Sequence, residues 1–187
     1  VRIIQEAAKE AGAPNGLIQC IETTTMQATD TLMKHPDTGI ILATGGSAMV
    51  KAAYSSGNPA LGVGPGNGPS FIERSANIAM AVKHIMDSKT FDNGTICASE
   101  QSIVTESVIE AQVVEEVKRQ GGYFLDEEQS KKLEKMIMRA NNTMNPAIVG
   151  KSVQKIVQMA GITVPEGTRV LVSRQTEVGP THPYSRE

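Results

Sequence analysis

The sequence lacks tryptophan, and its few Phe and Tyr residues bring the aromatic content to only 3% of 187 residues. Its two cysteines are too few for a disulfide framework and favour a reducing, cytoplasmic compartment. No apolar run reaches the ~18 residues that a transmembrane helix needs, so we expect no membrane partner. Basic and acidic residues nearly balance, with a formal net charge of −2, which argues against nucleic acid as a partner.

What the sequence does contain is enough for a packed core. Hydrophobic residues make up 40% of the chain, and 17 glycines add to them. This composition is typical of a globular domain and excludes a disordered or coiled-coil protein.

The first 63 residues alternate helical and strand patterns. Apolar spacing predicts helices over residues 4–11, 26–34 and 48–55, and short strands over residues 17–21, 40–43 and 59–63. The strand at 40–43 is continuously apolar, as expected for a strand buried on both faces of a parallel sheet. Cys20 lies in the strand at 17–21 and is expected in the core. The alternation predicts an α/β layer with right-handed crossovers.

A glycine-rich junction at residues 62–69 separates this part from a second set of elements. We expect a subdomain hinge or crossover there, because its glycines and prolines cannot continue a helix. Beyond it, the patterns predict helices over residues 78–86, 108–120, 126–140 and 153–160, and strands over residues 102–105 and 169–173. Asp126 and Ser152 are expected to cap two of these helices, and Gly161 to end the last one.

Residues Thr44, Gly45 and Gly46 stand between a predicted buried strand and the start of a helix. Backbone N–H groups in such a turn can face a phosphate or dinucleotide without obstruction by side chains. The pattern is neither a P-loop nor G-x-G-x-x-G, so the residues alone favour a tight strand-to-helix turn without a ligand, and the ligand-binding turn is the alternative. Gly64, in the junction, similarly suits either a bare hinge or close approach by a flat cofactor.

Cys97 lies in a predicted loop between an amphipathic helix and a strand. Such loops often carry reactive groups, and backbone N–H groups at a turn can stabilise both a thiolate and a neighbouring oxyanion. The alternative is a buried, inert cysteine, which is the commoner fate of a free thiol. The histidines and cysteines lack metal-ligand spacing, so no metal site is expected.

Four segments resemble the CoA-acylating aldehyde dehydrogenases, most of all the aldehyde dehydrogenase half of bifunctional aldehyde–alcohol dehydrogenases. They are residues 41–46, 50–57, 62–67 and 89–102, the last being the most specific. The resemblance implies an α/β fragment of the aldehyde dehydrogenase fold. Residues 1–63 would end a Rossmann-type NAD-binding domain, and residues 64–187 would form the first part of the catalytic domain. It also implies that further site residues lie outside this chain.

The same resemblance implies an enzyme that oxidises a short-chain aldehyde to acyl-CoA with NAD and coenzyme A, and runs in reverse during fermentation. Cys97 would be the nucleophile, and Thr44, Gly45, Gly46 and Gly64 would line the nicotinamide cofactor. Gly62 would stand where hydrolytic relatives carry a glutamate that activates water, which favours acyl transfer to a thiol. A homo-oligomer is expected. The alternatives are a hydrolytic or semialdehyde dehydrogenase and a non-catalytic assembly module.

Overall fold

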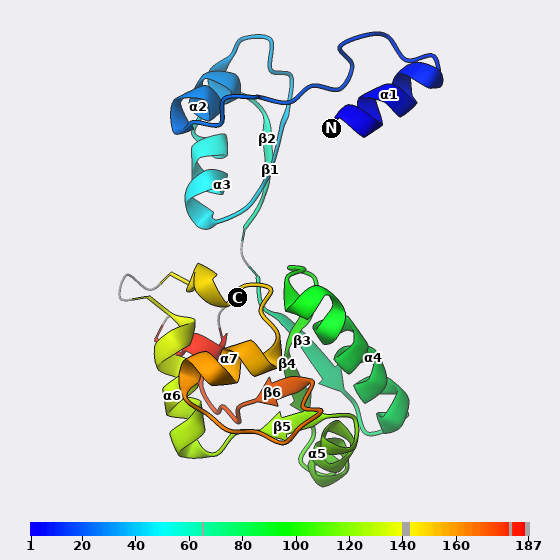
Figure 1. Ribbon diagram of the computed structural model, residues 1–187, viewed down its shortest axis with the longest axis vertical. Helices are drawn as coiled ribbons and strands as arrows, with labels where there is room; N and C mark the ends of the chain where they lie inside the picture. The colour runs from blue at the N-terminus through cyan, green and yellow to red at the C-terminus, as the bar shows by residue number, and fades with distance from the viewer. Residues whose placement is uncertain (65, 140–142, 180, 186–187) are drawn as a thin grey trace. The chain divides into compact units, whose positions relative to one another are not determined.

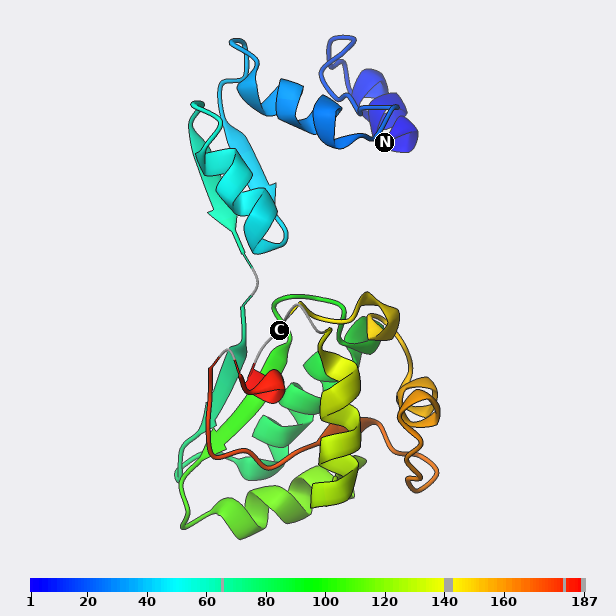
Figure 2. The ribbon, with the colours of Figure 1, turned by 90° about the vertical axis from the view of Figure 1, so that its left-hand side faces the viewer.

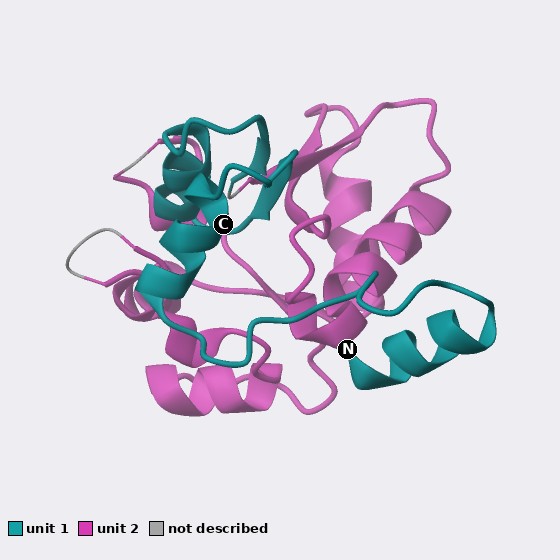
Figure 3. Ribbon diagram, turned by 90° about the horizontal axis from the view of Figure 1, so that it is seen from above, with its two compact units in different colours: residues 1–65 teal, residues 66–187 magenta. Residues whose placement is uncertain are grey.

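The computed structural model describes residues 1–64, 66–139, 143–179 and 181–185. The chain divides into two compact units, Val1–Pro65 and Gly66–Glu187, which are coloured separately in Figure 3. The glycine-rich junction predicted from the sequence contains the point of division. Within the described ranges, no helix has the length and apolar character needed to cross a membrane.

The first unit is built around two parallel strands joined by a helix (Figure 1). Its elements are α1 (Arg2–Glu10), α2 (Met26–Lys34), β1 (Ile41–Thr44), α3 (Ser47–Tyr54) and β2 (Ala60–Val63). The register runs from Ile41 opposite Ala60 to Thr44 opposite Val63. Helix α3 is the crossover and packs against both strands; Ala43 of β1 and Ala53 of α3 itself are buried.

Two expectations for this unit are wrong. Residues 17–21 form no strand; the N–H of Leu17 donates to the carbonyl of Pro14 in a turn, and Cys20 is exposed. A strand needs a neighbour to take its backbone hydrogen bonds, and no described strand pairs with this segment. Nor is β1 buried on both faces: its Leu42 is 74% exposed, because α3 covers only the opposite face.

The second unit contains two further pairs of parallel strands. Its elements are β3 (Gly68–Ile72), α4 (Ile78–Thr90), η1 (Phe91–Gly94), β4 (Glu100–Thr105), α5 (Glu110–Arg119), β5 (Gly122–Phe124), α6 (Glu127–Ile137), η2 (Pro146–Ile148), α7 (Val153–Ala160), β6 (Val170–Val172) and η3 (Pro183–Ser185). Strand β3 pairs with β4, and β5 pairs with β6. The strands β3 and β5 were not predicted from the sequence.

The main core of this unit lies where α4 packs against β3, β4 and α5 (Figures 1 and 2). The predicted stripe on α4 is confirmed, since Val82, Ile85 and Met86 are all buried. Val113 and Val117 of α5 belong to the same buried cluster as this stripe. A smaller cluster joins α6 and α7 to the β5–β6 pair.

The predicted helix caps are also confirmed. Asp126 and Gln129 form a reciprocal capping box at the start of α6. The Ser152 hydroxyl accepts a hydrogen bond from the N–H of Lys155 at 3.3 Å, and Gly161 ends α7 in the left-handed conformation, with φ of 64°. These local signals fix the ends of the helices around the second core.

Candidate active site

Cys97 lies on the segment between η1 and β4, and its side chain is exposed. The N–H of Ser99 donates to the carbonyl of Ile96 at 3.0 Å, which places Cys97 at the second position of a turn. The loop expected from the sequence is therefore present, and in this structure the thiol is exposed rather than buried. An accessible thiol held between regular elements has the exposure that a nucleophile needs. The catalytic role itself stays a prediction.

The backbone just before this turn adopts an unusual conformation. Asp92, Asn93 and Gly94 are three consecutive left-handed residues, with φ of 48°, 52° and 73°. A non-glycine residue in this region costs about 1–3 kcal/mol, although Asn and Asp adopt it most readily. Both the N–H and the hydroxyl of Thr95 donate to the carbonyl of Asp92, at 3.2 and 2.8 Å, and so close the strained turn.

Two side-chain hydrogen bonds hold the loop that carries Cys97 and the elements on either side of it. The Asn93 side-chain amide donates to the carbonyl of Gly150 at 3.1 Å. On the other side, the Lys89 ammonium donates to the side-chain oxygen of Gln101 at 2.7 Å. The segment that carries Cys97 is therefore attached through Asn93 to residues beyond α6, and the two elements that flank it, α4 and β4, are bonded to each other, which restricts how far it can move.

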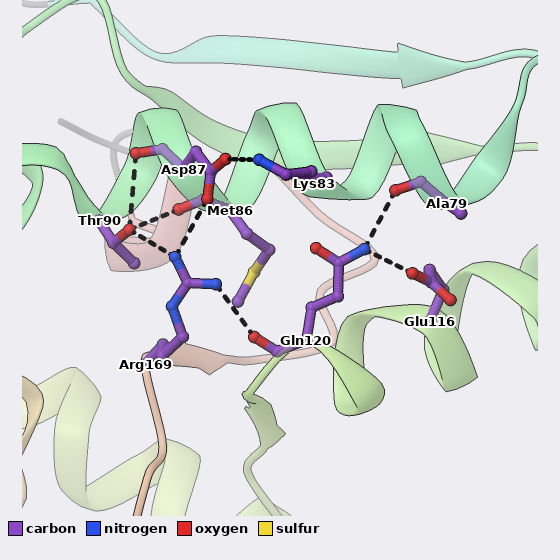
Figure 4. Close-up of polar contacts among 8 residues, drawn as sticks. All are labelled: Ala79, Lys83, Met86, Asp87, Thr90, Glu116, Gln120 and Arg169. Atoms are coloured by element: carbon purple, nitrogen blue, oxygen red, sulfur yellow. Dashed lines mark hydrogen bonds and ion pairs between the residues drawn. The ribbon is translucent and has the colours of Figure 1, made fainter.

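The C-terminal end of α4, from which the loop departs, is held by Arg169 (Figure 4). Its guanidinium donates to the Asp87 carboxylate at 3.2 Å and to the Thr90 hydroxyl at 3.1 Å. A second nitrogen donates to the carbonyl of Gln120 at 3.3 Å. The Thr90 hydroxyl in turn donates to the carbonyl of Met86 at 2.7 Å. Arg169 thus joins the last turn of α4 to the end of α5.

These contacts also favour the ionised form of the Asp87 carboxylate at the end of α4. Hydrogen bonds from Lys83, and then from Arg169, lower the pKa of Asp87 below its usual 3.8. The carboxylate therefore remains ionised throughout the neutral range and keeps both cations in place. Because all three side chains are at least two-fifths exposed, solvent weakens the attraction, and the network mainly orients the helix end.

The four predicted cofactor residues lie together in the first unit. Thr44 ends β1 opposite Val63 of β2, so Gly45 and Gly46 leave the sheet at the same edge as Gly64. The N–H of Gly45 donates to the carbonyl of Val63 at 3.1 Å and extends the pairing by one residue. This edge is formed by the carboxyl ends of parallel strands, where α/β proteins commonly bind ligands.

The space around these glycines differs from one to the next. A Cβ atom added to Gly46 or to Gly64 would meet no atom within 4 Å, whereas one on Gly45 would lie 3.1 Å from the sulfur of Met49. Gly46 is also the N-cap residue of α3. The backbone at Gly46 and Gly64 is therefore open to close approach, which fits a dinucleotide phosphate or ring.

The interpretation of Gly62 is wrong in its geometry. A Cβ atom there would stand 2.5 Å from Val50 Cγ1 and 2.8 Å from Tyr54 Cε2, both on α3. A side chain at this position would thus point into α3. Successive residues of a strand point to opposite faces, so the exposed Leu61 and Val63 lie on the face that Gly62 avoids.

Sequence reasoning missed the residues that hold the Cys97 loop in place. Lys89, Asn93 and Arg169 bond to partners far from them in the sequence, and their type alone gives no sign that they support one loop. The one local signal was Asp92-Asn93-Gly94, because these residue types favour left-handed backbone.

Among the residues that the structure describes, no cluster of His, Cys, Asp and Glu could hold a metal ion.

Known proteins resemble this chain over nearly its whole length. A probable aldehyde dehydrogenase from Listeria monocytogenes EGD-e has a solved structure that matches with a TM-score of 0.96 and 65% identity, covering 100% of this chain and 41% of that one. Aldehyde-alcohol dehydrogenase 2 of Entamoeba histolytica is 47% identical over 194 residues, 100% of this chain and 22% of its own length. A Rhodopseudomonas palustris propionaldehyde dehydrogenase with bound CoA and an acylated cysteine matches with a TM-score of 0.84 and 29% identity, over 98% of this chain and 41% of that one.

The chain spans about two-fifths of the length of the solved structures that it matches, and about one-fifth of the curated relative. The model of the aldehyde dehydrogenase family matches residues 1–184. Family model, sequence identity and fold agree over the same residues. The chain therefore belongs to the aldehyde dehydrogenase family.

Proposed function

We propose that the intact protein oxidises a short-chain aldehyde to acyl-CoA, and performs the reverse reduction, with NAD as the hydride carrier. The observation that carries this proposal is the exposed Cys97 thiol, held at a turn within a strained and anchored loop. The family membership and the relative with an acylated cysteine support the same chemistry.

In the first step, the Cys97 thiolate adds to the aldehyde carbonyl carbon and forms a thiohemiacetal whose oxygen carries the negative charge. The backbone N–H of Cys97 is the predicted donor to this oxyanion. Bound NAD would supply the hydride acceptor for this carbon, and the Cys97 sulfur would then hold the acyl group as a thioester. Attack by the thiol of coenzyme A then gives acyl-CoA and frees Cys97, with one proton released overall.

The choice of a thiol over water rests on the segment around β2. Hydrolysis of a thioester needs a base that deprotonates water. Residues 59–69 contain no acidic side chain, so this segment supplies no such base. The coenzyme A bound to the Rhodopseudomonas relative supports the same acceptor. Gly62 itself does not decide the choice, because a Cβ atom at this position would point into α3.

The two units would divide the work. Thr44, Gly45 and Gly46, together with Gly64 at the start of the next part, would hold NAD at the open edge of the β1–β2 pair, so that residues 1–63 serve as part of the cofactor-binding domain. Residues 64–187 would supply the nucleophile as part of the catalytic domain. The fit of the first group rests on the free space at Gly46 and Gly64.

We also propose a homo-oligomer in the cytoplasm, as the family resemblance and the two free cysteines suggest.

The proposal is tested with Cys97→Ser in the intact protein, and with Cys20→Ser as the matched control because that thiol is also exposed. Cys97→Ser should abolish acyl-CoA formation and leave NAD binding intact, while Cys20→Ser should retain both. Incubation with an acyl-CoA should acylate the peptide that contains Cys97, detected by mass spectrometry. Activity retained in Cys97→Ser would refute the assignment, and NADH formation without coenzyme A would indicate a hydrolytic enzyme.

A further inference from the structure

Strand β4 contains one residue more than its partner at the point where the Cys97 loop enters it. Gly68 of β3 lies opposite Glu100, and the next residue, Pro69, lies opposite Ser102. Gln101 is therefore left without a register partner, which makes a β-bulge. A bulge bends its strand and changes the direction of the neighbouring residues, and bulges are often found beside active sites.

Side chains hold this bulge from both sides. From the end of α4, the Lys89 ammonium donates to the Gln101 side-chain oxygen at 2.7 Å. From the residue before β3, the side-chain oxygen of Asn67 accepts a hydrogen bond from the Ser102 hydroxyl at 3.2 Å. Both hydrogen bonds are partly shielded from solvent. The bulged residue and the one after it are thus each attached to a different element.

Lys89 supports the loop as well as the bulge. Its Nζ atom lies 3.5 Å from the position that a Cβ atom on Gly94 would take, so the ammonium lies against the left-handed turn. Burial lowers the pKa of Lys89, and the carboxylate of Glu100 opposes that shift. A half-buried cation is retained at this point because it has both a hydrogen-bond acceptor and a negative charge beside it.

The same corner collects buried polar atoms that lack partners. Among the described residues, these are the side-chain nitrogen of Asn67, the hydroxyl of Ser99 and one carboxylate oxygen of Glu100. A buried polar group without a partner destabilises the folded state. These atoms belong to two of the three residues that link Cys97 to the bulge, Ser99 and Glu100, and to Asn67, which accepts the hydrogen bond from Ser102. Unpaired buried polar groups in a native structure need an explanation, and a role at a functional site is one that the geometry of the adjoining bulge supports here.

We propose that Lys89 and Asn67 are positioning residues, which fix the bulge at Gln101 and so set the direction in which Cys97 is presented. The inference rests on the proposed function, because it assigns these residues to the nucleophile of that reaction. Neither residue needs to touch the substrate. Lys89 acts through Gln101 and the turn at Gly94, and Asn67 acts through Ser102.

The test compares Lys89→Met and Ser102→Ala with two matched controls in the intact protein. Lys118→Met removes an exposed lysine of α5 that pairs with Glu115 of its own helix, and Tyr184→Phe removes a partly buried hydrogen bond to the carbonyl of Ser130. Three quantities are measured for each variant: the melting temperature, kcat and KM for acetaldehyde, and the rate at which iodoacetamide alkylates the peptide containing Cys97.

Lys89→Met and Ser102→Ala should each lower kcat by about tenfold or more with little change in KM, since a small misplacement of a reacting group has this effect. They should also change the alkylation rate of Cys97 by at least about threefold. Ser102→Thr keeps the hydroxyl, so its kcat and its alkylation rate should both equal those of the unchanged protein. The two controls should leave both values unchanged, even where the melting temperature falls.

An unchanged alkylation rate in Lys89→Met and Ser102→Ala would overturn the inference, whatever happens to activity. The inference also fails if Tyr184→Phe alters the alkylation rate as strongly, because the effect would then reflect general loss of stability. The alkylation assay does not depend on the reaction. If Cys97→Ser retains activity while Lys89→Met still changes alkylation, the proposed function fails and the positioning role stands.

Discussion

The Tyr54 hydroxyl accepts a hydrogen bond from the backbone N–H of Gly62 at 2.9 Å. This contact fixes the end of α3 over β2, and it requires that residue 62 have no side chain, because Val50 and Tyr54 fill the space that a Cβ atom would occupy. The glycine is thus explained by the packing of a helix on a strand, and the absence of a catalytic carboxylate at this position is a consequence of that packing.

Gly62→Glu should therefore destabilise the first unit and create no hydrolytic activity. Forcing a side chain into this contact should lower the free energy of unfolding by about 1–3 kcal/mol. Urea unfolding of the intact protein measures the change, and NADH formation without coenzyme A measures hydrolysis. Val63→Glu is the control, since that side chain is 57% exposed and should tolerate the carboxylate. A stable Gly62→Glu protein that produces NADH without coenzyme A would contradict the packing argument.

Gly46→Ala should weaken NAD binding without weakening the fold. The backbone at Gly46 has φ of −62°, which any residue adopts, and a Cβ atom there meets no protein atom within 4 Å. If the cofactor approaches this backbone, the methyl group should raise the KM for NAD by about tenfold while the melting temperature stays constant. Gly57→Ala is the opposite control: with φ of +93° it should lower stability and leave KM unchanged. An unaltered KM in Gly46→Ala would remove Gly46 from the cofactor site.

The pair Arg74–Glu106 should make stability depend on pH in the acid range. The Arg74 side chain and backbone N–H both donate to the Glu106 carboxylate and lower the pKa of Glu106 below its usual 4.5. The unfolded chain then binds the proton more readily than the folded one, so this contribution is complete above about pH 4.5 and is lost as pH falls through the lowered pKa. Urea unfolding at a series of acid pH values measures the slope. Glu106→Gln and Arg74→Met should both flatten it, and an unchanged slope in both would refute the assignment.

The helices were largely predictable from the sequence because their signals are local. The residues from Met26 to Lys34 form a helix over the predicted range, since Thr25 caps it and the residue before Pro36 cannot continue it. The buried stripe of α4 likewise follows from apolar spacing. Strands were harder to predict because their stability depends on a partner far away in the sequence. Strand β3 begins with glycine and proline, which usually break strands, and only pairing with β4 explains it.

The candidate site was only partly predictable for the same reason. Cys97 and residues 44–46 stand in recognisable local contexts, so their positions in loops and turns followed from the sequence. The direction in which a side chain at position 62 would point did not follow from the sequence, because it depends on which face of β2 the helix α3 covers. The hydrogen bonds of Lys89 and Arg169 join residues 12 to 82 positions apart, and no local pattern indicates such contacts.

The strand pairs that the structure describes are all parallel, and this has a consequence for how the chain folds. Parallel neighbours cannot be joined by a short hairpin, so each pair closes a long loop before its backbone bonds form. Only α3 intervenes between β1 and β2, whereas α6, η2 and α7 intervene between β5 and β6. Closure of the longer loop costs more entropy, so refolding should bring the first pair together early and join Gly122 to Val170 late.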